Sequence, residues 1–349
     1  MDAAIGSSSA AAYDAATATF LSSLVGLAYA QFDHPEWNGQ IPSSQVPQGY
    51  TQIAAFKVPN LDLTAAADAF LDAHPELMPL VSSDVTALAA DTAAALNTQL
   101  SNALEDPATL AAVTAAATPP QAAAAGATDV WFGFALAPIS GNLSGSNIVA
   151  FRGTRTVVEW GLDATAVQVP VPLAWYKDGK LRLARVHLGF LILFAFLKPQ
   201  LDAAVKQFNA KAVGTQVTGH SLGGAETALT SIYLKLSSLL TPLQSYSQAS
   251  PRVGDSTFVS VYNYFVRSTF RIVNLADLVP ILPPTSLTIV VKGVKVSVQY
   301  AHVGQEFSYL WQTGDVGNNH GWQINYNPAT GDDIPTNTPR KYPNSGIPC

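Results

Sequence analysis

The sequence contains few charges and a single cysteine. Only 12% of its 349 residues are charged, the net charge is −6, and no run of basic residues occurs. Nucleic-acid binding is therefore not expected, because it depends on clustered Lys and Arg that neutralise phosphates. Cys349 is the only cysteine, so an intrachain disulfide is excluded and the cysteine content does not favour secretion. With 48% hydrophobic residues, the chain has enough apolar side chains for a folded core.

A basic leader and a long membrane-spanning run are also missing. Residues 20–30 form an apolar run that ends in Ala-x-Ala, as a signal peptide does, yet Asp2 and Asp14 are the only charges before it. Because signal peptides begin with a basic region, we expect residues 15–32 to form a first amphipathic helix, with a signal peptide as the alternative. Residues 188–197 are more apolar but too short for a membrane span, and we expect a buried core helix there. No transmembrane segment is predicted, and the sequence does not decide between a cytoplasmic and a secreted protein.

Alanine dominates one stretch of the chain, and strand and helix patterns alternate after it. Residues 61–127 combine alanine with leucine, threonine and aspartate at helical spacing, which predicts an insertion of roughly three helices. Strands are expected at 49–58, 129–137, 147–153, 215–219, 244–250 and 269–275, helices at 186–210 and 225–240, and a hairpin within 287–303. This alternation predicts a single α/β domain over residues 1–349, with a central, mostly parallel sheet that helices cover on both faces.

Ser221 stands where a predicted strand turns into a predicted helix. It is the middle residue of Gly219-His220-Ser221-Leu222-Gly223. A nucleophile on such a sharp turn has a strained backbone, and the two glycines remove side chains that would collide with the crossing strand and helix. The backbone N–H of Leu222, at the positive end of the following helix, is placed to donate to an oxyanion. The alternative is a glycine-rich turn with an ordinary serine.

A serine nucleophile needs a histidine base, and that histidine needs an orienting acid. On a strand–serine–helix turn the acid follows the serine and the histidine follows the acid, which leaves His302 and His320 as candidate bases. Asp277 follows a predicted strand and is the favoured acid, with Asp255 as its competitor. Glu226 is too close along the predicted helix to reach a histidine. His320 lies in a polar loop near the end of the chain and is easier to place over the sheet edge than His302, which ends a predicted strand.

Five motifs together resemble the fungal-type class 3 lipases of the α/β-hydrolase fold. In chain order they are FRGT (151–154), VHLGF (186–190), GHSLGG (219–224), PRVGD (251–255) and VNLADLVPILPP (273–284). The resemblance covers about residues 129–323 and implies that Ser221 is the nucleophile, Asp277 the acid and His320 the base of a catalytic triad. His302 falls in a YAHVGQE segment similar to a structural stretch of the family, which favours His320 as the base.

The resemblance also implies an oxyanion hole and a lid. Thr154 is the implied first donor to the oxyanion and the N–H of Leu222 the second, while Arg152 is expected to be structural. Residues 155–176 resemble the lid of the family. The apolar side chains of its short helix-like run are Val157, Val158, Trp160 and Leu162. Such a run can cover the serine in water and open at a lipid surface; the alternative is an ordinary surface loop.

The implied function is hydrolysis of a fatty-acid ester, as in triacylglycerol lipases, through an acyl-serine that water then releases. Phospholipase A1 or feruloyl-type esterase activity is the alternative within this fold, and a non-catalytic lipid-binding protein is the alternative outside it. The expected partners are a lipid or ester substrate and, transiently, a lipid–water interface. No cofactor and no metal are expected, although a zinc site is the alternative interpretation of the His-Pro-Glu strings at His34 and His74.

Two features depart from the family pattern. Its well-known secreted members carry disulfides and a signal peptide, for which this sequence gives no indication. The insertion at residues 61–127 has no counterpart in the pattern. A structural role, a second cap over the acyl site and a partner site remain the alternatives for it.

Overall fold

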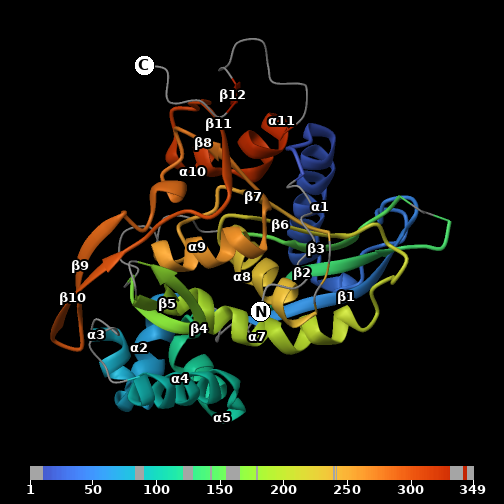
Figure 1. Cartoon of the computed structure of the whole chain (residues 1–349). Coiled ribbons are helices and arrows are strands. Elements are labelled where there is room, and N and C mark those ends of the chain that lie inside the picture. The colour runs from blue at the N-terminus through green and yellow to red at the C-terminus, as the bar shows by residue number, and fades with distance from the viewer. Residues whose placement is uncertain are drawn as a thin grey trace.

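The computed structural model describes residues 11–82, 90–120, 129–141, 144–154, 166–177, 180–238, 240, 242–330 and 341–343. Its central sheet consists of β1 (Tyr50–Pro59), β2 (Asp129–Pro138), β3 (Asn147–Phe151), β6 (Thr215–His220), β7 (Leu243–Gln248), β8 (Ser268–Asn274), β11 (Gln305–Tyr309) and β12 (Lys341–Pro343). Their order across the sheet is β1-β2-β3-β6-β7-β8-β11-β12 (Figure 1). The neighbours from β3 to β11 are parallel, whereas β1, β2 and β12 pair antiparallel at the edges. The predicted mostly parallel sheet is confirmed.

The remaining elements are helices and two separate strand pairs. Two hairpins lie outside the central sheet: β4 (Gln168–Lys177) with β5 (Lys180–His187), and β9 (Ser286–Val291) with β10 (Val294–Gln299). The described α-helices are α1 (Ala15–Asp33), α2 (Leu63–Ala73), α3 (Met78–Ser82), α4 (Ala90–Glu105), α5 (Pro107–Ala117), α7 (Leu188–Val205), α8 (Leu222–Ser237), α9 (Ser256–Phe265), α10 (Val316–His320) and α11 (Asn327–Thr330). Short 3-10 turns are Pro35–Trp37, Pro75–Leu77 and Val279–Ile281, and η5 (Trp322–Tyr326) is a π-helical turn.

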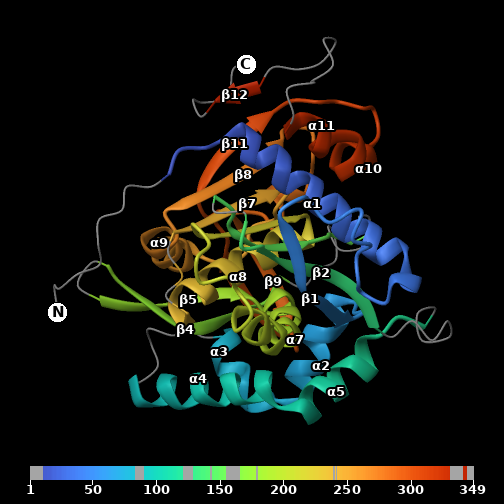
Figure 2. The ribbon, with the colours of Figure 1, turned by 90° about the vertical axis from the view of Figure 1, so that its right-hand side faces the viewer.

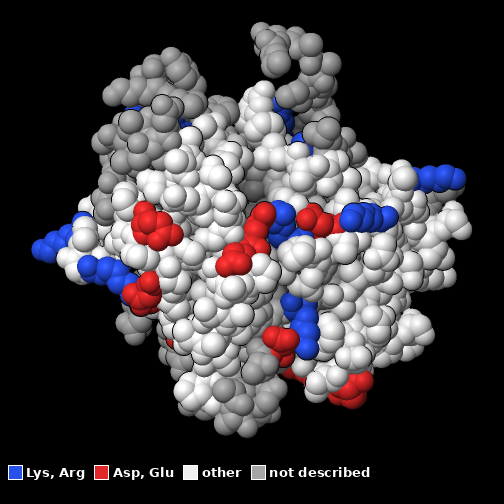
Figure 3. Space-filling model, turned by 90° about the horizontal axis from the view of Figure 1, so that it is seen from below, with Lys and Arg blue, Asp and Glu red and all other residues white. Residues whose placement is uncertain are grey.

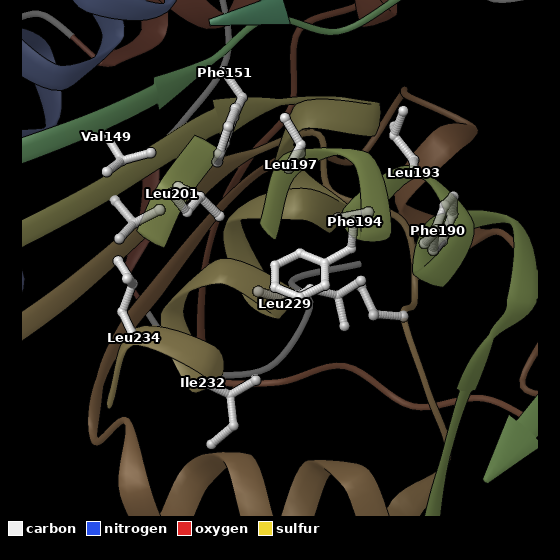
Figure 4. Packing of buried hydrophobic residues seen from close by; sticks show 14 of the residues in the cluster. Val149, Phe151, Phe190, Leu193, Phe194, Leu197, Leu201, Leu229, Ile232 and Leu234 are labelled. Atoms are coloured by element: carbon white, nitrogen blue, oxygen red, sulfur yellow. The ribbon is translucent and has the colours of Figure 1, made fainter. Parts of the chain in front are cut away.

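Helices cover both faces of the sheet, as an α/β-hydrolase requires. α1 packs on one face, and α7 and α8 pack on the other (Figures 1 and 2). Strand β3 shows the reason: Ile148 and Ala150 join the α1 side, while Val149 and Phe151 join the α7–α8 side. Since both faces are covered, every residue of β3 is buried. Figure 4 shows the hydrophobic core on the α7–α8 side of the sheet, where side chains of β3, α7 and α8 meet.

The helical insertion and the β9–β10 hairpin share a second hydrophobic core. Phe70 of α2, Val291 of β9 and Ile192 of α7 belong to one cluster of buried side chains. At its edge, Nζ of Lys292 lies 2.9 Å from Oδ1 of Asp72. The four described α-helices between residues 61 and 117, α2 to α5, lie within the predicted insertion. Residues 83–89 and 121–127 of the insertion are outside the part of the chain that the structure describes. The insertion packs against α7 and the hairpin, which supports a structural role for it.

We predict that Phe70→Ala lowers the free energy of unfolding by roughly 3–5 kcal/mol, because it leaves a cavity in this second core. Phe70 is fully buried, and the cluster joins the insertion to the rest of the chain. Urea unfolding followed by both tryptophan fluorescence and circular dichroism should show one transition, moved to lower urea. Asp72→Ala is the control, since it removes only an exposed ion pair worth about 1 kcal/mol or less. Two separate transitions, or equal losses in both variants, would contradict the shared core.

The face that α4, α5 and α7 form carries few charges. Figure 3 shows it mostly uncharged, with acidic and basic side chains largely beside one another. Nζ of Lys198 lies 3.3 Å from Oε1 of Glu105 and 3.7 Å from Oδ2 of Asp202. Such exposed pairs contribute only about 0.2–1 kcal/mol each. They balance the charge of this face locally and add little to stability.

One hairpin is absent from the sequence-based expectations. Residues 168–176 belong to the segment expected to be a lid, yet they form β4 and pair antiparallel with β5. Pro170 and Pro172 lie in β4, and proline removes a strand donor, so the sequence pattern does not signal a strand. The hairpin accommodates them because β4 pairs with β5 only and has a register shift between Pro170 and Ala174. The segment 155–176 is therefore not one uniform lid.

Among the residues that the structure describes, two helices are long and apolar enough to cross a membrane by length and composition. They are α1 and α7, and about half of the apolar window of each is buried inside the protein. The prediction of a core helix at residues 188–197 is confirmed by α7, whose buried side chains form much of the layer in Figure 4. Helix α1 begins after Asp14, whose carboxylate accepts from the N–H of Thr17 at 2.6 Å.

Candidate active site

Ser221 lies at the tight turn between β6 and α8. Its backbone angles are φ 59° and ψ −122°, a strained conformation for a residue with a side chain. A Cβ atom on Gly219 would lie 2.2 Å from the carbonyl oxygen of Gly223, and one on Gly223 would lie 2.3 Å from that of Arg152. Real side chains do not approach backbone atoms so closely, so both positions require glycine. The expected strand-to-helix turn is present.

Ser221, His320 and Asp277 form a continuous chain of hydrogen bonds. Nε2 of His320 lies 2.8 Å from the hydroxyl oxygen of Ser221, and Nδ1 of His320 lies 2.8 Å from Oδ2 of Asp277. Because a carboxylate only accepts hydrogen bonds, Nδ1 carries the proton and Nε2 accepts the serine proton. All three side chains are buried. The structure thus brings together the three residues that the sequence selects, and their arrangement suits proton transfer from the serine hydroxyl.

Two further donors hold the carboxylate of Asp277. The hydroxyl of Tyr326 donates to Oδ2 at 2.6 Å, and the N–H of Val279 donates to Oδ1 at 2.9 Å. Burial, and then the nearby carboxylate, raises the pKa of Tyr326 well above its usual value, so its hydroxyl remains a donor. The N–H of Asn274 donates to the same hydroxyl oxygen at 3.1 Å. These contacts fix the carboxylate in its orientation toward His320.

The competing base and acid occupy structural positions. Nε2 of His302 donates to the carbonyl oxygen of Pro280 at 2.7 Å. Burial, first of all, lowers the pKa of His302 well below its usual value, so this imidazole is neutral. Asp255 caps α9 by accepting from the N–H of Phe258 at 2.7 Å. Neither side chain takes part in the hydrogen-bond chain of Ser221.

The loop after β3 presses against the nucleophile turn. A Cβ atom on Gly153 would lie 2.7 Å from Cβ of Ser221, so the chain passes this point only with glycine. Arg152 holds the loop, because its Nη1 donates to the carbonyl of Gly153 at 2.6 Å and its Nε to that of Trp131 at 2.7 Å. Burial lowers the pKa of Arg152 to about 10, which leaves it charged at neutral pH. Arg152 thus supports the loop, as expected for a structural residue.

Thr154 and Leu222 flank the serine from two sides. Thr154 follows Gly153, which abuts Ser221. Leu222 is the first residue of α8, and the first N–H groups of a helix have no carbonyl one turn earlier to pair with. The positive end of α8 also favours negative charge here. Leu222 thus adjoins Ser221 in the chain, and the residue before Thr154 abuts Ser221 in the fold; the donor roles of Thr154 and Leu222 are a proposal below.

The predicted lid side chains lie outside the described residues. Val157, Val158, Trp160 and Leu162 belong to residues 155–165. From residue 166 onward, two hydrogen bonds hold the chain in place. The hydroxyl of Tyr300 donates to the carbonyl of Ala166 at 3.0 Å, and the side-chain amide of Gln168 donates to the carbonyl of Gln299 at 2.7 Å. Both contacts join this end of the segment to the chain at the end of β10.

The two His-Pro-Glu strings form local pairs. Nδ1 of His34 lies 2.7 Å from Oε1 of Glu36, and Nδ1 of His74 lies 3.0 Å from Oε1 of Glu76. The other ring nitrogen of His74 lies 3.1 Å from the hydroxyl of Thr109. Within the described ranges, no group of three or more His, Cys, Asp or Glu side chains is arranged to hold a metal ion. In each string the histidine thus pairs with the glutamate two residues later, and His74 also contacts α5.

Glu226 is a buried carboxyl group without a visible function. It lies on α8 just after the nucleophile turn, is fully buried, and neither carboxyl oxygen has a hydrogen-bond partner among the described residues. Burial raises its pKa well above the usual value. The folded protein therefore binds more protons than the unfolded chain above about pH 4.5, and its stability falls as the pH rises.

We predict that Glu226→Gln stabilises the protein, and more so at higher pH. Between the ordinary pKa and the raised one, each pH unit costs the wild type about 1.4 kcal/mol of stability, and the variant escapes this cost. Urea unfolding of both proteins over a range of about pH 5 to 8 measures the difference. A difference that stays constant with pH, or a less stable variant, would show that the carboxyl group is ionised or partnered.

The sequence pattern does not predict some residues that contact the triad or its neighbours. Tyr326 donates to the acid, and Tyr29 contacts His220 from α1, with 2.9 Å between the hydroxyl oxygen and Nδ1. A tyrosine in an apolar helix carries no local signal for such a contact, because 191 residues separate it from its partner.

Comparison with known proteins gives a consistent result. Residues 148–287 match the family model for class 3 lipases. The lipase of Rhizomucor miehei is 33% identical over 169 residues, which cover 46% of this chain and 40% of that protein. Phospholipase A1-II 3 of Oryza sativa subsp. indica is 26% identical over 184 residues, covering 45% of this chain and 44% of that protein. The chain thus spans less than half the length of these relatives.

A structural comparison adds a further neighbour. A Rhizomucor miehei lipase propeptide complex is 27% identical in sequence, with a TM-score of 0.40, and the similarity covers 55% of this chain and 61% of that one.

Proposed function

We propose that the protein is a serine ester hydrolase that cleaves fatty-acyl esters, because residues 148–287 of this chain match the class 3 lipase family model. The observation that carries this proposal is the hydrogen-bond chain from Ser221 through His320 to Asp277, with 2.8 Å at each step. A serine is a weak nucleophile alone, and this arrangement supplies the base and the orienting acid that it needs.

In the proposed acylation step, the hydroxyl oxygen of Ser221 attacks the ester carbonyl carbon. Nε2 of His320 takes the hydroxyl proton as the new C–O bond forms, and Asp277 stabilises the resulting imidazolium. His320 then gives the proton to the leaving alcohol as the old ester bond breaks. The acyl group remains on Ser221 as an ester, and the alcohol departs.

In the proposed deacylation step, water takes the place of the alcohol. His320 removes a proton from water, the hydroxide oxygen attacks the acyl-serine carbonyl, and the proton returns to the oxygen of Ser221. The fatty acid leaves and the serine hydroxyl is restored. The backbone N–H groups of Thr154 and Leu222 would donate to the carbonyl oxygen while it carries negative charge, and one such donor is typically worth roughly a 100- to 1,000-fold change in rate.

Exposed apolar side chains near the site support a lipid substrate. Leu278 and Ile281 follow Asp277 closely and are 49% and 55% exposed, and Val316 and Ile324 flank His320 with similar exposure. All four lie within four residues of Asp277 or His320 in the sequence, and exposed apolar groups beside a catalytic site favour an interaction surface there. We propose that they contact a lipid–water interface transiently during catalysis, and that the predicted lid at residues 155–176 covers the serine away from it.

A phospholipase A1 activity is the second candidate, because one relative is a rice phospholipase A1-II. Both reactions use the same serine chemistry and differ in the polar part of the substrate. A feruloyl-type ester is a third option on the same residues. Hydrophobic contacts alone discriminate acyl length weakly, at about 0.8 kcal/mol per methylene.

Hydrolysis of four substrates by the purified protein tests the proposal. They are emulsified triacylglycerol, phosphatidylcholine vesicles, p-nitrophenyl butyrate and methyl ferulate, each with Ser221→Ala as the blank. Release of fatty acid from the first marks a lipase, and from the second a phospholipase. Binding of vesicles without hydrolysis of any substrate would contradict an enzyme and favour the non-catalytic lipid-binding alternative.

A further inference from the structure

A buried hydrogen-bond relay joins α1 to both sides of the candidate active site. The N–H of Gly153 donates to the hydroxyl oxygen of Tyr29 at 3.0 Å. That oxygen lies 2.9 Å from Nδ1 of His220, and Nε2 of His220 lies 2.9 Å from the carbonyl oxygen of His320. Three segments far apart in the chain, the loop before Thr154, the residue before Ser221 and the backbone of His320, are thus linked through two side chains.

The donors and acceptors of this relay permit one arrangement only. The carbonyl oxygen of His320 accepts, so Nε2 of His220 must carry a proton and donate. A neutral imidazole then has Nδ1 as an acceptor, which takes the hydroxyl proton of Tyr29. The hydroxyl oxygen of Tyr29 still accepts from Gly153. Burial, and then the neighbouring His320, lowers the pKa of His220 well below its usual value, which agrees with this neutral form.

The packing of α1 holds the relay in place. Tyr29 and His220 are both buried, and the ring of Trp322 lies 6.0 Å from that of Tyr29. Trp322 also donates from Nε1 to the hydroxyl of Ser22 at 3.2 Å, and a Cβ atom on Gly26 would lie 2.1 Å from its ring. Helix α1 therefore packs directly on the segment that follows His320, and little room is left for that segment to move.

We propose that Tyr29 and His220 are positioning residues that set His320 and the Gly153–Thr154 loop at fixed places around Ser221. The inference rests on the ester hydrolase function proposed above. Neither side chain touches the reacting atoms. The relay fixes the backbone of the base through its carbonyl and the backbone of the oxyanion loop through the N–H of Gly153. Loss of the Tyr29 hydroxyl removes the acceptor of the Gly153 N–H and the donor that orients His220, and small displacements of catalytic groups slow a reaction strongly.

The variant Tyr29→Phe tests the proposal by removing one oxygen atom. With soluble p-nitrophenyl butyrate, kcat should fall roughly 10- to 100-fold, while KM should change less than about threefold, since substrate contacts are retained. Tyr262→Phe is the matched control, because Tyr262 is also a buried tyrosine, on α9, and its hydroxyl lies 3.1 Å from that of Thr269 in β8. It should lose stability to a similar extent and keep kcat. Equal kcat values in Tyr29→Phe and wild type would overturn the proposal.

Two variants of His220 separate positioning from packing. The side chain of His220→Gln still offers an N–H to the carbonyl of His320, whereas His220→Leu fills space without a donor. We expect Gln to retain several-fold more kcat than Leu, and Tyr29→Phe combined with His220→Leu to lose no more than the worse single variant, since both break one unit. An equal loss in both His220 variants, or additive losses in the double variant, would contradict the relay.

The tautomer of His220 is measurable without any activity. In a protein labelled with ¹⁵N-histidine, Nε2 of His220 should resonate as protonated and Nδ1 as an unprotonated acceptor, with assignment from the missing signals of His220→Gln. A proton on Nδ1 would overturn the relay whatever the enzyme does. If the wild type hydrolyses no ester but shows the expected tautomer, the proposed function fails and the hydrogen-bond relay stands.

Discussion

Ser221→Ala should abolish ester hydrolysis, with a loss of kcat on the order of a millionfold. The hydroxyl is the atom that attacks, and no other group occupies its place between β6 and α8. The fold should be retained, because among the described residues the side chain hydrogen-bonds to His320 alone and alanine is smaller than serine. The assay is initial-rate hydrolysis of a soluble ester, with thermal unfolding measured beside it.

Ser237→Ala provides the control for this variant. Ser237 ends the same helix and is exposed, so its loss should leave both the rate and the unfolding midpoint unchanged. If Ser221→Ala hydrolysed the ester at the wild-type rate, the nucleophile would have to be another group, and the proposed mechanism would be wrong.

The second large effect concerns the base. His320→Ala should reduce kcat by roughly 10,000-fold or more, because Ser221 then has no proton acceptor and the residual rate comes from the oxyanion donors and binding alone. Asp277 also loses its partner, since Nδ1 of His320 lies 2.8 Å from its Oδ2. Initial rates and unfolding curves for the same preparation separate loss of chemistry from loss of fold.

His302→Ala should behave differently. It leaves the buried carbonyl of Pro280 without its donor, which costs roughly 1–3 kcal/mol of stability. Because Pro280 lies three residues after Asp277, we expect a fall in kcat of about tenfold at most, far less than for His320→Ala. The reverse pattern, with His302→Ala inactive and His320→Ala active, would mean that the base is assigned to the wrong histidine.

The nucleophile turn was predictable from the sequence because its geometry is local. Gly219 and Gly223 are needed at close contacts within the same turn and with the neighbouring strand, and the pentapeptide records this need directly. The buried strands of the sheet were predictable for a similar reason. In β3, which is covered on both faces, Ile148 to Phe151 are consecutive apolar residues.

The choice among acids and bases required more than the local pattern. Chain order reduces the candidates to Asp277 or Asp255 and His302 or His320, and the family resemblance then favours one of each. The structure explains the difference by hydrogen bonding: Asp255 caps a helix and His302 holds a carbonyl. Asp255 caps the helix that begins at the next residue, whereas the carbonyl that His302 holds lies 22 residues away in the sequence, so no local pattern indicates that second partner.

The remaining features depend on packing between distant segments. Tyr29 meets His220 across 191 residues, and its helix resembles a signal core by composition. The second core likewise forms between α2, α7 and the β9–β10 hairpin, which periodicity within each segment does not reveal. The sequence pattern does not predict β4, because prolines have a low strand propensity. A strand that pairs with a neighbour on one side only tolerates them.

Labelling with a fluorescent fluorophosphonate, followed by peptide mapping, tests the nucleophile most directly. The reagent bonds covalently only to a serine that a neighbouring base activates. We predict one label per chain, on the peptide that contains Ser221, formed in parallel with the loss of ester hydrolysis and absent in His320→Ala. An active enzyme that stays unlabelled at Ser221, or that carries the label on another serine, would contradict the proposed catalytic centre.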